Sequence, residues 1–169
     1  MATTIRMLTE TGPRFVGLEE WERLDADSNR VVFRNGRYGF NCYGFCIEGA
    51  ETAVRYEEGD DEVWIETCQS PNGRYSYSLF YRLVGVAGQQ DSGYCWDENC
   101  GWKDRKQAVS AALETVLERV KDLSSPFMSP DGRVSAVIGK RARLKQVKEY
   151  LEKKLDFWDP AVIDILKID

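Results

Sequence analysis

An alternation of apolar and polar residues marks the clearest predicted element of the chain. Between residues 75 and 83, apolar side chains occupy every second position: Tyr75, Tyr77, Leu79, Tyr81 and Leu83. Arginine and serine fill most positions between them, and a period of two puts the apolar side chains on one face of a β-strand. Phe80 and Val84 interrupt the polar face, so we expect its second half to be covered as well.

Shorter β-rich segments precede this strand and are separated by turn-forming residues. We expect strands at 31–33, 37–47, 52–56 and 62–68, and a short edge strand within 94–102. Asn35-Gly36 predicts a hairpin, because both central residues of a type I′ turn need a positive φ. Gly39 and Gly44 suggest a bulge in the strand that follows. Residues 1–16 show no clear period, and residues 89–93 have the composition of a loop.

Helical spacing appears on both sides of the β-rich block. A short amphipathic helix is predicted over 18–24, with Trp21 on its apolar side. Asp104 is a good N-cap for a longer helix, and Gln107 is placed for the reciprocal capping bond. Apolar residues recur in this helix at three- and four-residue spacing: Val109, Leu113, Val116, Val120 and Leu123.

The C-terminal part of the chain is also predicted to be helical. Two prolines between residues 124 and 132 indicate a linker. Residues 133–138 fit either a strand or a helix, and Gly139 separates them from a helix over 140–155. Asp159-Pro160 has the form of an N-cap followed by a proline at the first helical position, which opens a last short helix. One side of the 140–155 helix is apolar: Leu144, Val147, Leu151 and Leu155.

A run of strands followed by helices predicts an α+β fold. We expect an antiparallel β-meander of about five strands packed against a helix, followed by C-terminal helices. The α+β domain would cover residues 1–123, including the helix 104–123. A linker loop over 124–132 and a partly basic helical extension over 133–169 would complete the chain of 169 residues.

The composition narrows the class of protein. Apolar residues make up 43% and charged residues 30%, as in globular proteins. No stretch approaches the roughly 20 apolar residues that span a bilayer, and no signal peptide opens the chain, so we expect a cytoplasmic protein without membrane contact. Histidine is absent, which removes the commonest general acid–base group and the commonest metal ligand. Since the sequence also contains no catalytic motif, we expect a protein that is not an enzyme.

The odd number of cysteines favours a reduced, cytosolic chain. A structural zinc ion would need four of the five: Cys42, Cys46, Cys95 and Cys100. On an extended strand, Cys42 and Cys46 would lie about 13 Å apart, whereas zinc holds its sulfur ligands about 4 Å apart. Only a turn at Gly44 would bring this pair together. We therefore expect no cofactor, with structural zinc as the less favoured alternative.

The distribution of charge suggests a type of partner. Residues 1–70 carry 7 basic and 14 acidic residues, a balance of −7, within a chain of net charge −5. Our leading hypothesis is a non-enzymatic interaction protein, a stoichiometric inhibitor or adaptor of the immunity or phage/plasmid counter-defence type. Its acidic, aromatic-bearing β region would attract a protein or nucleoprotein partner with a basic surface. The predicted contact residues are acidic or tryptophan: Glu57, Glu58, Asp60, Asp61, Glu62, Trp64, Trp96 and Trp102.

Two alternatives stay open. Basic residues gather in the helix around 140–154, where they could meet nucleic-acid phosphates: Lys140, Arg141, Arg143, Lys145 and Lys148. The solvated face of an amphipathic helix explains the same residues. The carboxylates between 57 and 62 could instead hold a divalent cation or act as an acid–base pair, although a solvated hairpin tip is the commoner origin of such a cluster.

Overall fold

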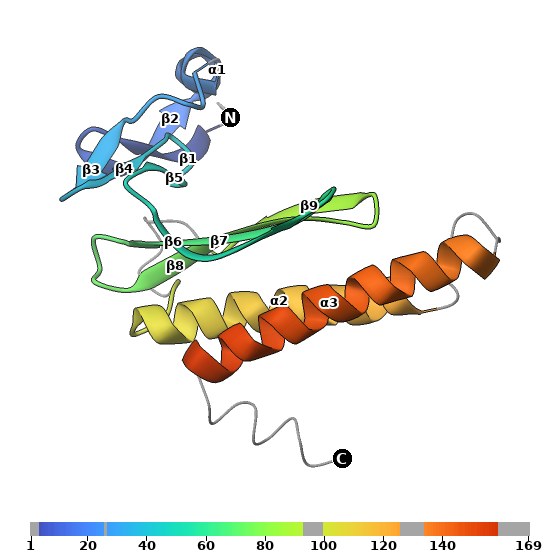
Figure 1. Ribbon diagram of the computed structural model, residues 1–169. Coiled ribbons are helices and arrows are strands. Elements are labelled where there is room, and N and C mark those ends of the chain that lie inside the picture. Colours follow the sequence, from blue (N-terminus) through green and yellow to red (C-terminus); the bar gives the residue numbers. More distant parts are fainter. Residues whose placement is uncertain (1–3, 26, 93–99, 126–133, 159–169) are drawn as a thin grey trace.

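The protein has a mixed α+β fold, as predicted, with antiparallel sheets and helices at its C-terminal side (Figure 1). The structure is a computed structural model that describes residues 4–25, 27–92, 100–125 and 134–158. In chain order the elements of this part are β1 (Thr4–Thr9), β2 (Gly12–Gly17), α1 (Leu18–Asp25), β3 (Phe33–Asn35), β4 (Tyr38–Phe40), β5 (Cys46–Glu48), β6 (Glu51–Glu58), β7 (Asp61–Gln69), β8 (Tyr75–Leu83), β9 (Val86–Asp91), α2 (Arg105–Ser124) and α3 (Val134–Trp158).

One meander of about five strands is predicted, but the strands divide between sheets: β6–β9 form a four-stranded antiparallel meander in sequence order, and β3–β5 form a separate three-stranded sheet. The alternation in β8 has the predicted effect, because Tyr77, Leu79 and Leu83 are buried on one face. A loop is predicted over 89–93, but β9 pairs with β8 from Val86 to Asp91. Most side chains of β9 are exposed, so this strand carries no apolar pattern that would reveal it.

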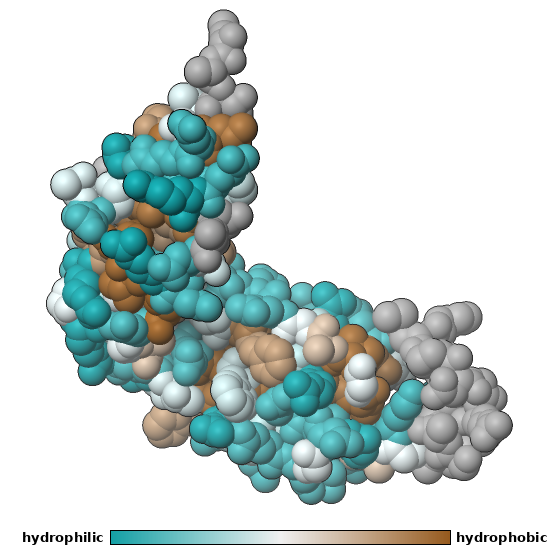
Figure 2. Space-filling model, turned by 90° about the horizontal axis from the view of Figure 1, so that it is seen from above, coloured by the Kyte–Doolittle hydropathy of each residue, from teal (hydrophilic) through white to brown (hydrophobic). Residues whose placement is uncertain are grey.

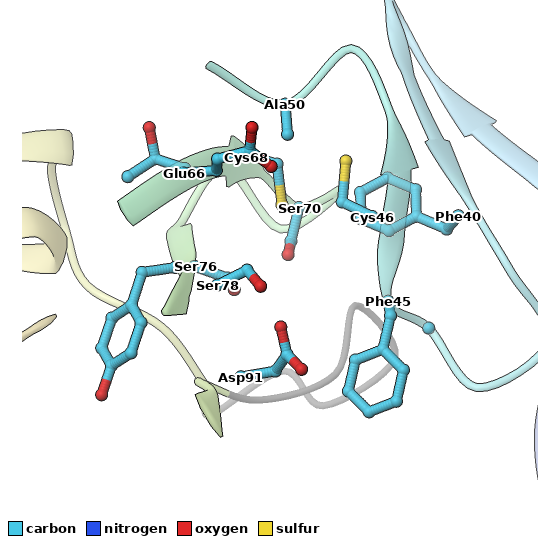
Figure 3. A pocket seen from close by; sticks show the side chains of 13 residues that line it. Phe40, Phe45, Cys46, Ala50, Glu66, Cys68, Ser70, Ser76, Ser78 and Asp91 are labelled. Atoms are coloured by element: carbon cyan, nitrogen blue, oxygen red, sulfur yellow. The ribbon is translucent and has the colours of Figure 1, made fainter. Parts of the chain in front are cut away.

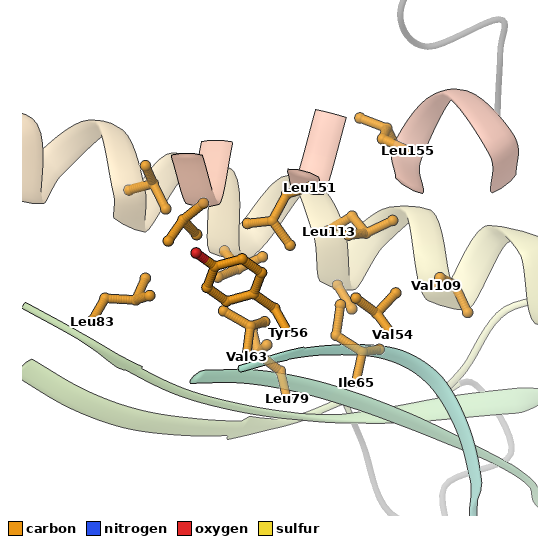
Figure 4. Packing of buried hydrophobic residues seen from close by; sticks show 14 of the residues in the cluster. Val54, Tyr56, Val63, Ile65, Leu79, Leu83, Val109, Leu113, Leu151 and Leu155 are labelled. Atoms are coloured by element: carbon orange, nitrogen blue, oxygen red, sulfur yellow. The ribbon is translucent and has the colours of Figure 1, made fainter. Parts of the chain in front are cut away.

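Helices α2 and α3 lie side by side against one face of this sheet and bury it (Figures 1 and 4). Asp104 caps α2 as predicted, since its carboxylate accepts the Gln107 backbone N–H at 2.8 Å. The apolar side of α3 enters the same buried cluster as Ile65 and Leu79 of the sheet, through Leu144, Val147, Leu151 and Leu155. The described part of the C-terminal segment therefore shares the core of the sheet.

Helix α3 begins earlier than predicted, at Val134, and continues through Gly139. No atom lies within 4 Å of the position that a Cβ at Gly139 would take, so the glycine does not serve a close contact there. A glycine inside a helix costs about 1 kcal/mol relative to alanine, and packing of the following turns outweighs that cost. The predicted short helix from Asp159 and most of the predicted linker lie outside the described residues.

The β1–β2 hairpin occupies the N-terminal segment in which the sequence shows no period. Met7 and Leu8 are neighbours in β1, yet each is only 1% exposed, because different clusters cover the two faces of the strand. Met7 packs with Val16 and Cys42, whereas Leu8 packs with Phe40. A strand buried on both faces has no alternation, so the sequence pattern cannot reveal it. The helix predicted after this hairpin is confirmed as α1.

The single strand predicted over 37–47 is wrong, because the chain reverses within it and forms β4 and β5. Asn41 holds the reversal: its side-chain oxygen accepts the N–H groups of Tyr43 and Phe45 at 3.0 and 3.1 Å. Gly44 lies in this loop with a φ of 83°, a conformation that favours glycine. The hairpin before it has its two-residue loop starting at Gly36, one residue later than predicted.

Leu151→Ala tests whether α3 is part of the common core. Leu151 is fully buried in the cluster that joins both helices to the sheet, and loss of such a side chain costs about 2–5 kcal/mol. We expect the free energy of unfolding to fall by this amount in one transition, in urea titrations followed by circular dichroism and tryptophan fluorescence. Lys153→Ala, on the exposed side of the helix, is the control, with a change within about 0.5 kcal/mol. Separate transitions for helix and sheet would contradict a shared core.

Candidate functional site

The face of the β6–β9 sheet that points away from α2 and α3, here called the open face, carries the strongest candidate site. The strand registers place Arg55 opposite Trp64, Trp64 opposite Phe80, and Phe80 opposite Gln89. Directly paired residues of an antiparallel sheet point to the same face, so these four side chains form one row. Ile65, the next residue after Trp64, points the other way into the core.

The N-terminal strands cover only one end of the open face. Beside Cys68 and Ser76, a cavity of about 20 Å³ lies between the two sheets, and its other side is lined by Phe40 and Cys46 (Figure 3). Figure 2 views the molecule from this side and shows the surface of the larger sheet extending away from the N-terminal strands. Trp64 is 36% exposed, so within the described part of the chain this row is open to solvent at its tryptophan.

Trp64 is held in place by its neighbours on the sheet. The guanidinium carbon of Arg55 lies 4.7 Å from the centre of the tryptophan ring, and the Phe80 ring packs edge-on with its centre 6.3 Å away. Glu57 in turn accepts hydrogen bonds from Nε and Nη2 of Arg55 at 3.0 and 2.7 Å. A ring fixed in this way loses little conformational freedom when a partner covers it.

Carboxylates predominate around this row and at the β6–β7 loop. Glu62 pairs with Arg82 at 3.2 Å, and Glu58 accepts the hydroxyl of Tyr56 at 2.9 Å. Burial and the bond to Glu58 raise the pKa of Tyr56 to about 12, so this phenol stays protonated. The region as a whole holds two arginines, Arg55 and Arg82, and a larger set of acidic residues: Glu57, Glu58, Asp60, Glu62 and Glu66.

Asp61 differs from the other predicted acidic contact residues because its side chain is buried. The residue is 2% exposed, and its carboxylate accepts the Val84 backbone N–H and the Arg143 Nε–H, both at 2.6 Å. The bond to Asp61 raises the pKa of Arg143. Asp61 therefore ties the β8–β9 loop and α3 to the β6–β7 hairpin. The sequence holds a signal for this placement, since Asp61 shares its strand face with Val63.

The other predicted aromatic contacts do not join Trp64. Trp102 pairs through its backbone with Tyr75, and its ring centre lies 5.3 Å from that of Tyr77, which points into the core. Trp102 thus lies at the margin of the core on the helix side of the sheet. Trp96 lies outside the described residues. The residues that the structure adds to the open face are Arg55 and Phe80.

The basic residues of the alternative interpretation lie on α3, and most of them face carboxylates. Arg143 binds Asp61, and two others form pairs four residues apart on the helix: Lys145–Glu149 at 3.8 Å and Lys148–Glu152 at 3.4 Å. Arg141 is exposed and Lys140 is half-buried. Much of the positive charge of this stretch is therefore balanced on the helix itself.

The predicted zinc ligands do not assemble within the described part of the chain. A turn does occur at Gly44, yet Cys42 and Cys46 enter different clusters: Cys42 packs with Met7, and Cys46 packs beside Cys68. Cys100 is half-buried, and Cys95 lies outside the described residues. In the part that is described, no group of three or more cysteine, aspartate or glutamate side chains could hold a metal ion.

Comparisons with protein-family models, curated proteins and solved structures found no match to this chain. Within the described residues, no helix has the length and apolar character to cross a membrane.

Asp61→Ala tests the structural role of the buried carboxylate. The change removes the acceptor for Val84 and leaves Arg143 without its partner, so we expect a loss of about 1.5–3 kcal/mol in the free energy of unfolding. Asp61→Asn keeps an acceptor and should lose less. Asp60→Asn, on the exposed neighbour, is the matched control and should stay within about 0.5 kcal/mol in the same urea titrations. Equal stability of the alanine variant and the wild type would show that the buried contacts contribute nothing.

Proposed function

We propose that this chain is a non-enzymatic interaction protein that binds a protein or nucleoprotein with a basic surface through the open face. It would act as a stoichiometric inhibitor or adaptor, and the immunity or counter-defence type remains an analogy to other small acidic proteins. The observation that carries the proposal is the row Arg55–Trp64–Phe80, an aromatic and guanidinium cluster on a sheet face that the described helices do not cover.

The residue types in this row favour macromolecular contact. Tryptophan, tyrosine and arginine dominate the binding energy of protein interfaces, where they lie near the centre of the contact. Trp64 projects from a central strand with paired neighbours on both sides, which makes the row a rigid platform. A rigid aromatic anchor gives contact area at low entropic cost.

The charge around the row suggests the character of the partner. Glu57, Glu62 and Glu66 share the open face with Arg55 and Arg82, and Asp60 lies in the adjoining loop, which leaves this face acidic. Such a surface accelerates the approach of a basic partner and repels nucleic acid. The acidic groups would thus govern the rate of encounter, while Trp64 and Phe80 would hold the complex together.

Two cavities of the described part give catalysis less support than the open face gives binding. The cavity between the two sheets, about 20 Å³, has room for one water molecule, whereas small-molecule sites measure about 300–1,000 Å³. A groove of about 620 Å³ along α2 and α3 is lined by side chains of both charges, among them the Lys148–Glu152 pair. The sequence has no histidine that could serve as a general base in either place.

Trp64→Ala and Phe80→Ala test the proposed contact. The tagged full chain is first used to capture a partner from lysate of its native host, with and without nuclease, and the partner is then purified. We expect Trp64→Ala to weaken binding of that partner by roughly 30-fold or more, which corresponds to about 2 kcal/mol. The control is Phe15→Ala, which removes another exposed aromatic ring, 69% exposed on β2, and should change the affinity less than about twofold. Equal affinities of all three variants in calorimetry would refute the proposed site.

Salt dependence provides a second measure of the same surface. Raising the ionic strength should slow association with the purified partner and leave dissociation nearly unchanged, because exposed charges are screened. The combined variant Glu57→Gln, Asp60→Asn and Glu62→Gln should show a slower association at low salt and a flatter salt dependence. An association rate that does not respond to salt in stopped-flow experiments would contradict steering by the acidic face.

The basic face of α3 provides the test of the nucleic-acid alternative. If that face binds nucleic acid, replacing Lys140, Arg141 and Lys145 with alanine should abolish capture of partners that nuclease removes. Arg143 is left in place, because its removal would also break the bond to Asp61. Under the present proposal the triple variant captures the same partner as the wild type, and nuclease does not release it.

A further inference from the structure

The thiols of Cys46 and Cys68 meet at the junction between the two sheets. Cys46 belongs to β5 of the three-stranded sheet, and Cys68 belongs to β7 of the four-stranded sheet. Both line the small cavity between these sheets, and Figure 3 shows their side chains next to one another where the two sheets meet. The residues are 22 positions apart in sequence, so only the tertiary fold brings them together.

The two thiols differ in exposure. Cys68 is 7% exposed and belongs to the cluster formed with Leu8, Tyr38 and Phe40. Cys46 packs against the same cluster but is only half-buried, so reagents in solution reach it first. This is the usual arrangement of a redox-sensitive pair, in which an accessible thiol reacts and a second thiol resolves the product.

The electrostatic surroundings favour Cys46 as the reacting thiol. The pKa of Cys46 is lowered, first by a hydrogen bond from the Cys68 thiol and further by backbone hydrogen bonds of Glu48 and Gly39, against the opposing influences of burial and of the Glu66 carboxylate. A lower pKa increases the fraction of thiolate, which is the nucleophilic form of cysteine. The same neighbour that would close the bond therefore also activates its partner.

We propose that Cys46 and Cys68 form a reversible redox latch between the two sheets. The Cys46 thiolate attacks hydrogen peroxide, the O–O bond breaks, and a sulfenic acid and water are formed. The Cys68 sulfur then attacks the Cys46 sulfur, the S–O bond breaks, and a second water leaves as the disulfide closes. In total, two thiols lose two electrons and two protons, and one peroxide becomes two waters. A thiol reductant reverses the step by thiol–disulfide exchange.

The latch would change how firmly the two sheets are joined. The contacts described at this junction include the Asn35 amide bonded to the Gln69 carbonyl at 3.1 Å and the Tyr38 hydroxyl bonded to Glu51 at 2.7 Å. A covalent bond from β5 to β7 would add a link that does not open with local fluctuations. It would also close a loop of the chain between residues 46 and 68, which restricts the unfolded state.

Peptide mapping of the full chain tests the latch. The reduced wild type is treated with a few equivalents of hydrogen peroxide, free thiols are alkylated, and the protein is digested with trypsin without reduction. Trypsin releases Cys46 within residues 38–55 and Cys68 within residues 56–74. We expect these two peptides to be joined, and dithiothreitol to separate them.

Single cysteine variants identify the sulfur atoms and provide the controls. Cys42 shares its tryptic peptide with Cys46, so Cys42→Ser must keep the joined product, as must Cys100→Ser. Cys46→Ser and Cys68→Ser must lose it, with folding checked by circular dichroism. A joined product that survives Cys46→Ser would overturn the proposal. Oxidation of Cys46 to sulfinic acid without any joined product in the wild type would overturn it as well, and that result depends on no variant.

Thermal unfolding measures the effect of the bond on the fold. The oxidised wild type should unfold roughly 5–10 °C above the reduced protein, because a cross-link that closes a loop of this length stabilises the folded state. Peroxide treatment should leave the melting temperature of Cys46→Ser unchanged. A joined product without any rise in melting temperature would show that the bond strains the junction, and would contradict a latch.

Discussion

The contact between one face of the β6–β9 sheet and helices α2 and α3 determines the rest of the architecture. An antiparallel sheet whose strands alternate has one apolar face that must be buried. Both long helices of the described chain pack on that face, with residues such as Val116 and Val147 fully buried there. Of the described elements, the short strands of the N-terminal part are those that pack on the opposite face. Because both helices pack on the first face, the polar and aromatic side chains of the opposite face stay exposed.

Asp61 shows how a polar group is accommodated within this arrangement. It occupies an inward position of β7, where a carboxylate without partners would be costly. The Val84 N–H and the Arg143 guanidinium supply those partners from two other elements. Val84 has a φ of 48°, rare for a β-branched residue, and the bond from its N–H to Asp61 supports this turn. A residue at the tip of an acidic hairpin thereby helps to set the position of α3.

The sequence revealed those elements in which only one face is buried. The Tyr75–Leu83 alternation and the capped helix after Asp104 were predictable because each has one apolar side. The β1–β2 hairpin and β9 were not, since Met7 and Leu8 are buried on opposite faces and β9 is mostly exposed. The reversal at Asn41 depends on a side-chain oxygen that binds two backbone groups, which no periodicity records.

The residues of the candidate site were likewise predictable only in part. The exposure of Trp64 agrees with its position between the buried Val63 and Ile65, because successive residues of a strand point to opposite faces. Its partners Arg55 and Phe80 come from other strands, and their place beside it depends on the register fixed by the two hairpin loops. Asp61 was assigned to the surface because it lies in an acidic run, although the same alternation places it inward. Composition was thus a weaker guide than strand position.

The open face and the thiol pair are linked through strand β7. Trp64, Glu66 and Cys68 occupy alternate positions and therefore point to the same face of the sheet. The N-terminal strands cover Cys68 and stop short of Trp64, so their position on the sheet sets how much of this face a partner can reach. A bond from Cys46 to Cys68 would fix that position, because it joins the covering unit to the covered strand. Cys68 and the aromatic row thus lie on the same face of β7. A change in the position of the N-terminal strands on this face would alter both the access of a partner to the row and the redox state of the Cys46–Cys68 pair.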